Sequence, residues 1–213
     1  MTAALVLISA AGALAAKVNV RIEGKTRTLL SKANVPTRGG FLTRGGAPAG
    51  ACPATSAAGA LNVATKGRWG ATFKSSLNDY ELTSVLGERW TFTSPNYWAI
   101  WVNGKFASVG MCEIKLKRND HLLFAVDPLK HPEHPLRLTA PSRARAGRAF
   151  TVTVNWLADN GKGKPLSGVR IMGATTNKRG RATITATKRG RLRLKASKTG
   201  YIRSAVAPVS VSG

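Results

Sequence analysis

The residues best suited to recognition chemistry lie in the stretch YWAIWVNGKFASVGMC, which begins at Tyr97. It places Tyr97, Trp98 and Trp101 close together, and Asn103 follows in an Asn-Gly pair. Aromatic rings exposed on a strand can stack on a planar ligand or a sugar, and an asparagine amide can add a polar contact. These four residues therefore form a candidate site for a small soluble ligand or a glycan.

A structural interpretation of the same residues stays open. Side chains alternate along a strand, so Trp98 points to one face while Tyr97 and Trp101 share the other. One set would then face the core, and the other would pack under the glycine-rich loop 36–53. Asn103 would serve as a turn former in an Asn-Gly hairpin.

The cysteines, Cys52 and Cys112, are the second informative pair. Neither has a histidine nearby, so a zinc site or a histidine-activated thiol has little support. An even count in an exported chain favours one disulfide, with two free buried thiols as the alternative. In the chain-entropy model, closing a loop of about 60 residues stabilises a fold by roughly 4 kcal/mol.

Patterns for catalysis or metal binding are scarce. The chain has nine acids and three histidines, which are few groups for general acid–base chemistry. It contains no Gly-x-Ser-x-Gly elbow, P-loop or His-Glu-x-x-His. His131 and His134 flank Glu133, but prolines keep this segment extended and separate the three side chains. We expect a non-enzymatic protein with no catalytic residue and no metal site.

Positive charge is the extreme feature of the composition, with a formal net charge of +24. From residue 136 onward there are 17 Lys or Arg against one acid. Such a chain attracts polyanions. Because no nucleic-acid motif accompanies the charge, we expect anionic cell-envelope polymers or lipid headgroups as partners, and no nucleic acid. A general bias towards Lys and Arg is the alternative explanation.

The sequence RGRLRLKA focuses this charge, because a period of two projects alternate residues from one face of a strand. Antiparallel pairing with the preceding turn and strand would place further cations beside that row. The predicted polyanion-binding stripe comprises Lys178, Arg179, Arg181, Arg191, Arg193 and Lys195. Scattered solvated charges are the alternative.

Mostly strands must position these residues. Residues 1–16 are apolar or small and contain an Ala-Leu-Ala element, which predicts a signal peptide and a secreted or cell-surface protein, with a buried first element as the alternative. Apolar and polar residues then alternate from residue 18, which predicts a β-hairpin. A capped helix is expected over residues 55–67, and strands are expected to begin at Tyr80, Tyr97, Cys112 and His121.

A proline-rich linker, residues 129–135, separates residues 17–128 from residues 136–213. Beyond it, short alternating strands and glycine turns predict an immunoglobulin-like β-sandwich. The predicted fold class is mainly β with one short helix: a β-grasp-like α+β module followed by this sandwich.

The first part also resembles a known family, the DUF4430 or transcobalamin-C-terminal-like domain. The matching segments are VNVRIEG, CPATSAAGALNVAT and YWAIWVNGKFASVGMCEIKLKRNDHLLF. The resemblance implies a β-grasp-type domain of secreted or surface proteins. Asn119-Asp120 stands where the family has Gly-Asp, a change that the left-handed tolerance of asparagine absorbs.

In transcobalamin-type proteins the related domain covers one face of a corrinoid, and a large helical domain grips the other. This sequence shows no such helical domain, so we expect no cofactor, with a corrinoid as the alternative that the resemblance implies. The second part resembles bacterial immunoglobulin-like modules through GKPLSGVRI, TTNKRGRATI and LRLKASKTGYIRSA, at the level of fold.

Overall fold

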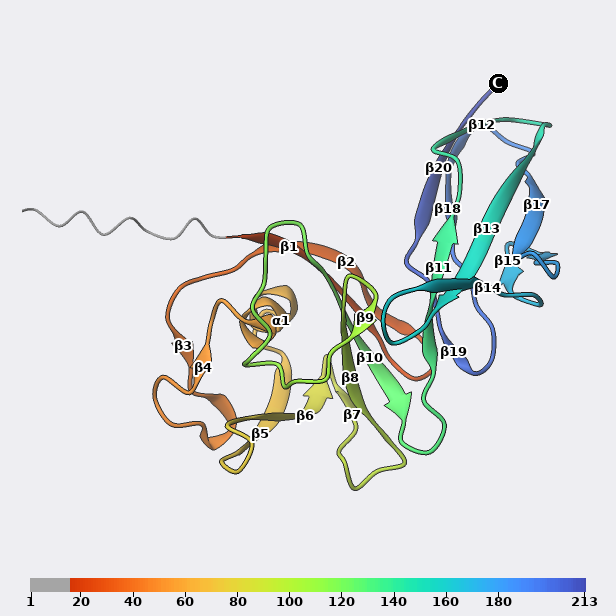
Figure 1. The fold of residues 1–213 in the computed structure, drawn as a ribbon. Coiled ribbons are helices and arrows are strands. Elements are labelled where there is room, and N and C mark those ends of the chain that lie inside the picture. The colour runs from red at the N-terminus through yellow and green to blue at the C-terminus, as the bar shows by residue number, and fades with distance from the viewer. Residues whose placement is uncertain (1–15) are drawn as a thin grey trace, which may run out of the picture.

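The computed structural model describes residues 16–213 as a chain built mainly of β-strands with one α-helix (Figure 1). The predicted fold class, mainly β with one short helix, is confirmed. The predicted signal peptide, residues 1–16, lies outside the described residues except for Ala16. Within the described part of the chain, no helix is long and apolar enough to cross a membrane.

We call residues 17–128 the first module. Its central sheet has five strands in the order β2-β1-β10-β8-β9, with β1 parallel to β10 and the other neighbours antiparallel. Their bounds are β1 Lys17–Glu23, β2 Thr28–Pro36, β8 Asn96–Val102, β9 Lys105–Phe106 and β10 His121–Pro128. Helix α1 (Ala57–Thr65) packs on one face, which gives a β-grasp-like arrangement.

Helix α1 forms where the sequence predicts it. Ser56 is its N-cap residue, and Lys66 and Gly67 leave it with positive φ angles. The first turn of α1 lies very close to the backbone of Ala54: a Cβ on Gly59 would be 1.8 Å from the carbonyl oxygen of Ala54. Glycine at position 59 thus lets the first turn of α1 pack closely against the segment that precedes it.

Shorter elements complete the first module around α1. Their bounds are β3 Phe41–Leu42, η1 Arg44–Gly46, β4 Cys52–Pro53, β5 Trp69–Lys74, β6 Asp79–Val85 and β7 Glu88–Arg89. Strands β5, β6 and β7 form a separate antiparallel sheet, and β3 pairs with β4. The glycine-rich loop 36–53 therefore contributes two short strands on the α1 side of the module.

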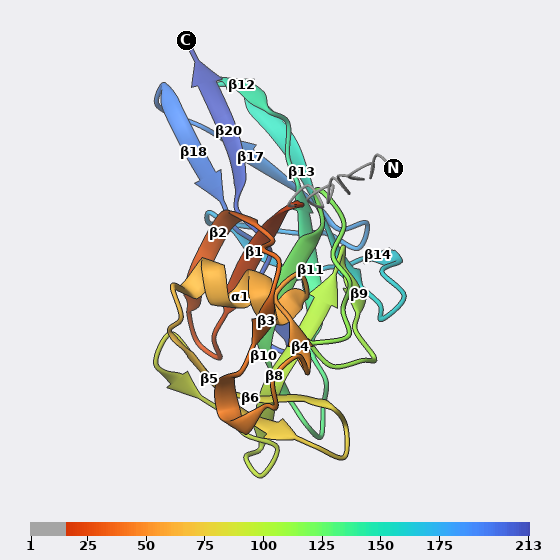
Figure 2. The same cartoon turned by 90° about the vertical axis from the view of Figure 1, so that its left-hand side faces the viewer.

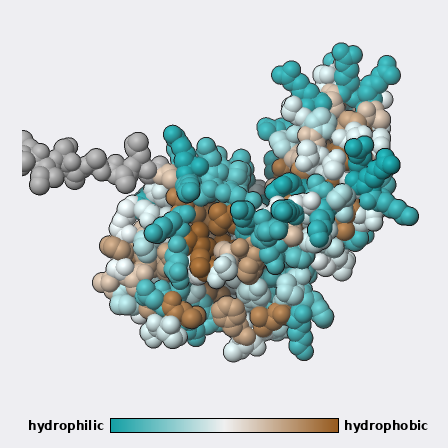
Figure 3. Space-filling model, viewed as in Figure 1, coloured by the Kyte–Doolittle hydropathy of each residue, from teal (hydrophilic) through white to brown (hydrophobic). Residues whose placement is uncertain are grey.

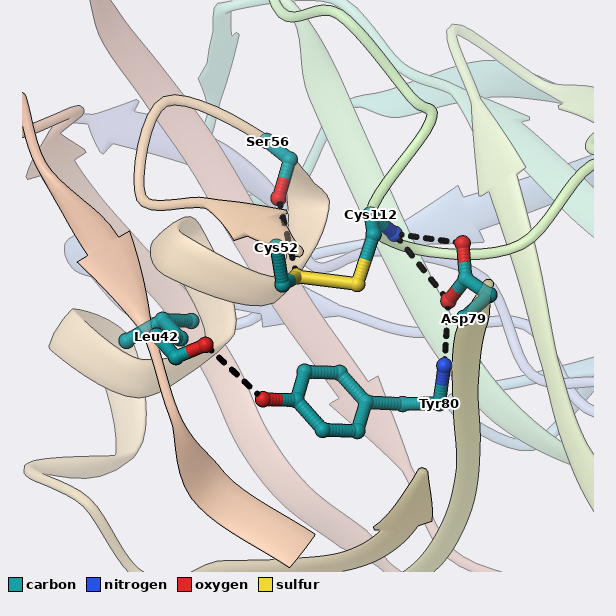
Figure 4. Close-up of a disulfide and its surroundings, with 6 residues drawn as sticks. All are labelled: Leu42, Cys52, Ser56, Asp79, Tyr80 and Cys112. Atoms are coloured by element: carbon teal, nitrogen blue, oxygen red, sulfur yellow. Dashed lines mark hydrogen bonds between the residues drawn. A yellow bond between two sulfur atoms is a disulfide. The ribbon is translucent and has the colours of Figure 1, made fainter. Parts of the chain in front are cut away.

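The predicted disulfide between Cys52 and Cys112 is present, with 4.9 Å between the Cα atoms (Figure 4). It ties the segment before α1 to the loop between β9 and β10. The carboxylate of Asp79 accepts hydrogen bonds from the backbone N–H groups of Tyr80 and Cys112, so the loop is held from β6 as well. The strand predicted from Cys112 is wrong: these residues form a turn with one isolated bridge, Ser56 to Lys115.

We call residues 134–213 the second module. One sheet has the order β14-β13-β11-β19, with β17 also paired to β13, and a second has the order β12-β20-β18. The bounds are β11 His134–Thr139, β12 Arg143–Arg145, β13 Ala149–Leu157, β14 Gly163–Pro165, β15 Arg170–Ile171, β16 Ala174–Thr175, β17 Arg181–Thr185, β18 Gly190–Leu194, β19 Tyr201–Ile202 and β20 Ala207–Ser212. Both sheets contribute buried side chains to one core, so the module is a β-sandwich.

The second module lies against the face of the central sheet that is opposite α1, and its strands β12, β18 and β20 extend beyond the first module (Figures 1 and 2). A small apolar cluster joins the two modules: Ala99, Trp101, Leu123, Ala125 and Ile202. Strand β11 begins at His134, inside the predicted linker 129–135, so the connection is shorter than the sequence suggests.

Candidate functional site

The four residues of the predicted aromatic site occupy different environments. Trp98 is 5% exposed and belongs to the core of the first module. Trp101 points to the opposite face of β8, where it is 2% exposed within the cluster between the modules. It packs against the second module and not under loop 36–53, which corrects the structural alternative. Neither indole presents a free face for stacking.

The other two members are also engaged. Tyr97 is half-buried, and its hydroxyl donates a hydrogen bond to Asp127 at 3.3 Å. Asn103 has a φ of 53° in the turn between β8 and β9. Its amide donates to Asp120 at 2.8 Å and accepts from the backbone N–H of His121 at 2.9 Å. These contacts are those expected of a turn former.

One end of the contact between the modules is closed by a buried carboxylate, Glu23, which is 1% exposed. Arg21 and Lys195 approach one of its oxygens at 2.8 and 2.9 Å, and Arg203 approaches the other at 2.9 Å. Arg203 also donates to the carbonyl oxygens of Gly24 and Arg27. We call Glu23 and its three cationic partners the Glu23 hub.

The hub sets the charge state of its members. Burial alone would raise the pKa of Glu23, but Arg21 and Lys195 outweigh it and hold that pKa below its ordinary value. Burial lowers the pKa of Lys195, although its bond to Glu23 opposes the shift. The hub therefore joins β1 to two segments of the second module as an ionised network.

Moving away from the hub, the two modules separate and leave a groove of ≈ 860 Å³. Lys195 contacts the hydroxyl of Thr28, so β18 and β2 both lead from the hub along the groove. Its volume lies in the range of ligand-binding clefts, about 300–1,000 Å³. Hydrophilic side chains lie on both sides of the notch between the modules in the space-filling view (Figure 3).

Cations line this groove from both modules: Arg21, Lys32, Arg137, Arg191 and Arg193. Among the described residues, no Asp or Glu lines it. Four of the five, all except Arg21, are exposed and have no side-chain hydrogen bond or ion pair within residues 16–213. Arg191 and Arg193 share one face of β18, about 6.6 Å apart by the rise of a strand. The groove is thus a positively charged channel.

Strand register orders the floor of the groove. Asn19 lies between Asn34 on β2 and His121 on β10, so a row of neutral polar side chains crosses the sheet. The next row in the direction of the hub runs from Arg21 through Leu123 to Trp101. The floor therefore offers amide and imidazole groups, while the charge is concentrated along the walls.

The structure separates the six residues of the predicted basic stripe. Strand β18 pairs with β20, whereas β17 pairs with β13 in the other sheet, so the predicted pairing is wrong. Lys178, Arg179 and Arg181 therefore do not lie beside Arg191, and Lys195 is part of the Glu23 hub. Of the six predicted stripe residues, only Arg191 and Arg193 line the groove.

Sequence reasoning did not identify Asn19, Arg21, Lys32 and Arg137 as site residues. The alternation of VNVRIE did place Asn19, Arg21 and Glu23 on one strand face. What that face meets is decided by docking of the second module, for which no local pattern exists. The sequence did contain one indication of this site: Glu23 lies among alternating apolar residues, and the structure buries it among cations.

A second buried carboxylate lies on the same sheet face. Asp127 is 1% exposed and accepts a hydrogen bond from the backbone N–H of Glu133 at 2.7 Å. Burial raises the pKa of Asp127 to about 6, although this bond and the Tyr97 hydroxyl oppose the shift. Burial and the charge of Asp127 raise the pKa of Tyr97 to about 12. No cation pairs with Asp127 among the described residues.

The histidines do not converge on a ligand set. The ring of His134 lies 4.7 Å from that of Trp156, tilted by 35°, and its Nδ1 is 3.6 Å from Asp159 Oδ1. Within residues 16–213, no three side chains of metal-binding type lie together. The neighbour of His134, Glu133, pairs with Lys25 at 3.2 Å.

No family model matches this sequence, and no curated protein is significantly similar to it. The resemblance to the DUF4430 or transcobalamin-C-terminal-like domain, and to immunoglobulin-like modules, therefore stays a prediction.

Proposed function

We propose that this chain is a secreted or cell-surface, non-enzymatic protein that binds a linear anionic polymer in the groove between its modules. The observation that carries the proposal is the groove itself: cations from both modules line it, and all of them except Arg21 have no ion pair among the described residues. Arginine suits such a partner because its planar guanidinium recognises carboxylate and phosphate groups.

The distribution of acids supports this reading. Eight of the nine acids have a hydrogen bond or an ion pair to another described residue, and the exception within residues 16–213 is Glu113. The acids are therefore mostly paired within the protein, and most Lys and Arg side chains have no ion pair in the part of the chain that the structure describes. The disulfide supports export, because such bonds persist in oxidising compartments.

A ligand bound on the aromatic strand has less support than a polymer in the groove. Trp98 and Trp101 are buried, and Tyr97 and Asn103 are held by neighbours within the protein. We also propose that the first module is related to the DUF4430 or transcobalamin-C-terminal-like domain, and its β-grasp-like strand order supports this relation. It does not specify the ligand, because one fold serves many functions.

A charge-reversal experiment tests the groove. The groove variant carries Lys32→Glu, Arg191→Glu and Arg193→Glu; the matched control carries Lys178→Glu, Arg179→Glu and Arg181→Glu. Both lose the same net charge from exposed positions, but the control sites lie outside the groove. Binding is measured as the anisotropy of fluorescein-labelled sodium polygalacturonate, with neutral dextran as the competitor.

We expect the groove variant to lose roughly 100-fold in affinity, about 1 kcal/mol for each of three charged contacts. The control variant should lose less than about tenfold, which is the non-specific share. Wild-type binding should weaken as ionic strength rises through about 0.15 M, where the Debye length is about 8 Å. Equal losses in the two variants would show that the groove is not the site.

A further inference from the structure

The positive charge of the groove continues onto the outer face of a neighbouring sheet. Strand β18 contributes Arg191 and Arg193 to the groove, and it is an edge strand of the sheet β12-β20-β18. The other edge strand, β12, contains Arg143 and Arg145. All four arginines are exposed, whereas the residues that alternate with them pack against the core of the second module. The four side chains therefore lie on the outer face of this sheet.

Strand register places these arginines in two columns, one on each side of β20. Arg143 and Arg191 both pair with Ser210, so they flank this residue from opposite sides. Arg145 pairs with Ser212, one step further from the groove. Neighbouring strands lie about 4.8 Å apart, so the two columns are about 10 Å apart. The two serines are exposed and short, and they form the low centre of a shallow trough.

We call the four arginines and the two serines between them the arginine strip. None of its arginines takes part in an ion pair within residues 16–213. The one acid of the second module, Asp159, lies at the opposite end, where its carbonyl oxygen accepts a hydrogen bond from the backbone N–H of Phe106 in the first module. Hydrophilic side chains project from the end of the second module that is far from the first (Figure 3). The strip thus presents free guanidinium groups, which bind carboxylates and phosphates through paired hydrogen bonds.

From this arrangement we infer that the binding site for the anionic polymer extends out of the groove along the arginine strip. A chain that leaves the groove beside Arg193 and Arg191 next meets Arg143 and Arg145 across the serines of β20. This inference rests on the proposed function, because it concerns the same polymer, but it adds a second binding surface outside the groove. A long chain occupies both surfaces, whereas a short fragment is held by the groove alone.

Ligand length separates the strip from the groove. The strip variant carries Arg143→Glu and Arg145→Glu, and both positions lie outside the groove. We expect it to lose roughly 30-fold in affinity for fluorescein-labelled sodium polygalacturonate, which is about 2 kcal/mol. Its affinity for labelled trigalacturonate should fall no further than that of a control variant with the same net charge. Retained binding of trigalacturonate also shows that the variant is folded.

Two further variants carry the same change in net charge. Lys178→Glu with Arg179→Glu is the control, because both residues are exposed and lie outside the groove and the strip; it should lose less than about fivefold for either ligand. Lys32→Glu with Arg137→Glu alters the groove alone and should weaken both ligands. Equal losses of polygalacturonate affinity in the strip and control variants would overturn the inference. The proposed function would still stand if the groove substitutions weakened both ligands.

A single carboxylate can neutralise the strip without removal of a cation. Ser210→Glu places this carboxylate between Arg143 and Arg191 at an exposed strand position, and it should lower the affinity for polygalacturonate several-fold. Thr183→Glu alters an exposed position of β17 and is the matched control, with an expected change of less than about twofold. An unchanged affinity in Ser210→Glu would contradict the inference. So would a strip variant that lost binding to phosphatidylglycerol vesicles but kept the wild-type affinity for polygalacturonate, because the strip would then be a lipid contact.

Discussion

The two ends of the contact between the modules use the same kind of residue in opposite ways. At the Glu23 hub, one buried carboxylate gathers Arg21, Lys195 and Arg203. At the groove, Arg191 and Arg193 continue the row that begins with Lys195, but no described carboxylate faces them. Two positions along the chain thus separate Lys195, which joins the modules, from Arg193, which is left for a partner.

The comparison shows what neutralisation does at this contact. A cation close to a buried carboxylate is fixed in place and becomes part of the structure. A cation without such a partner stays hydrated and is available for an external anion. The position of Glu23 therefore sets the boundary between the Glu23 hub, which joins the modules, and the groove.

Removal of that carboxylate should have the largest effect. Glu23→Gln leaves three cations at the hub without a counter-charge, and breaking a buried pair in this way costs about 3–5 kcal/mol. We expect this loss in the free energy of unfolding, measured by urea titration at neutral pH. Glu113→Gln is the control, because Glu113 is exposed and its side chain has no partner among the described residues. A loss below about 1 kcal/mol would contradict the role of the hub.

The same variant tests how the stability of the protein changes as pH falls. The pKa of Glu23 is lowered in the folded protein, so its contribution is present above the ordinary pKa of a glutamate and is lost as pH falls below it. Stability of the wild-type protein should therefore decrease below about pH 4.3, the ordinary glutamate pKa. The Glu23→Gln variant should lack this component of the decrease.

Asp127 sharpens the comparison, since it is a buried carboxylate on the same sheet face without a cation. Its pKa is raised to about 6, so its favourable contribution is present below the ordinary aspartate pKa and is lost as pH rises to about 6. The drop in stability amounts to about 2–3 kcal/mol between pH 4 and pH 7. Asp127→Asn should abolish it in unfolding titrations across this range. An unchanged pH profile would show that Asp127 does not titrate there.

The ion pair between Lys25 and Glu133 should have the smallest effect. It links the first module to the segment before β11 at 3.2 Å, but both side chains are partly exposed. Exposed pairs contribute about 0–1 kcal/mol, so Lys25→Met should change the free energy of unfolding by no more than that. Lys74→Met, which breaks a similar pair with Glu81 inside the first module, is the comparison. A larger loss at Lys25 alone would extend the hub to this pair.

Much of the fold could be predicted from local patterns. The alternation around Val18, the cap at Ser56 and the Asn103-Gly104 turn each specify backbone conformation within a few residues. The pairing of Cys52 with Cys112 followed from their count, since two cysteines allow only one bridge. The strand expected at Cys112 failed, because the disulfide and Asp79 hold that segment as a turn.

The candidate site could be predicted only in part. The sequence determined that β18 presents Arg191 and Arg193 on one face, because the period of a strand is two. It also determined which residues of β1 alternate, and hence that Glu23 shares a face with Asn19. Only the tertiary structure decided what these faces meet. Arg21 and the backbone of Arg203 are 182 positions apart in the chain, and no local rule relates them. Docking brings the acid of β1 together with Lys195 and Arg203, which follow β18 and β19, because pairing removes the cost of burying either charge alone. At the other end it leaves the cations in water.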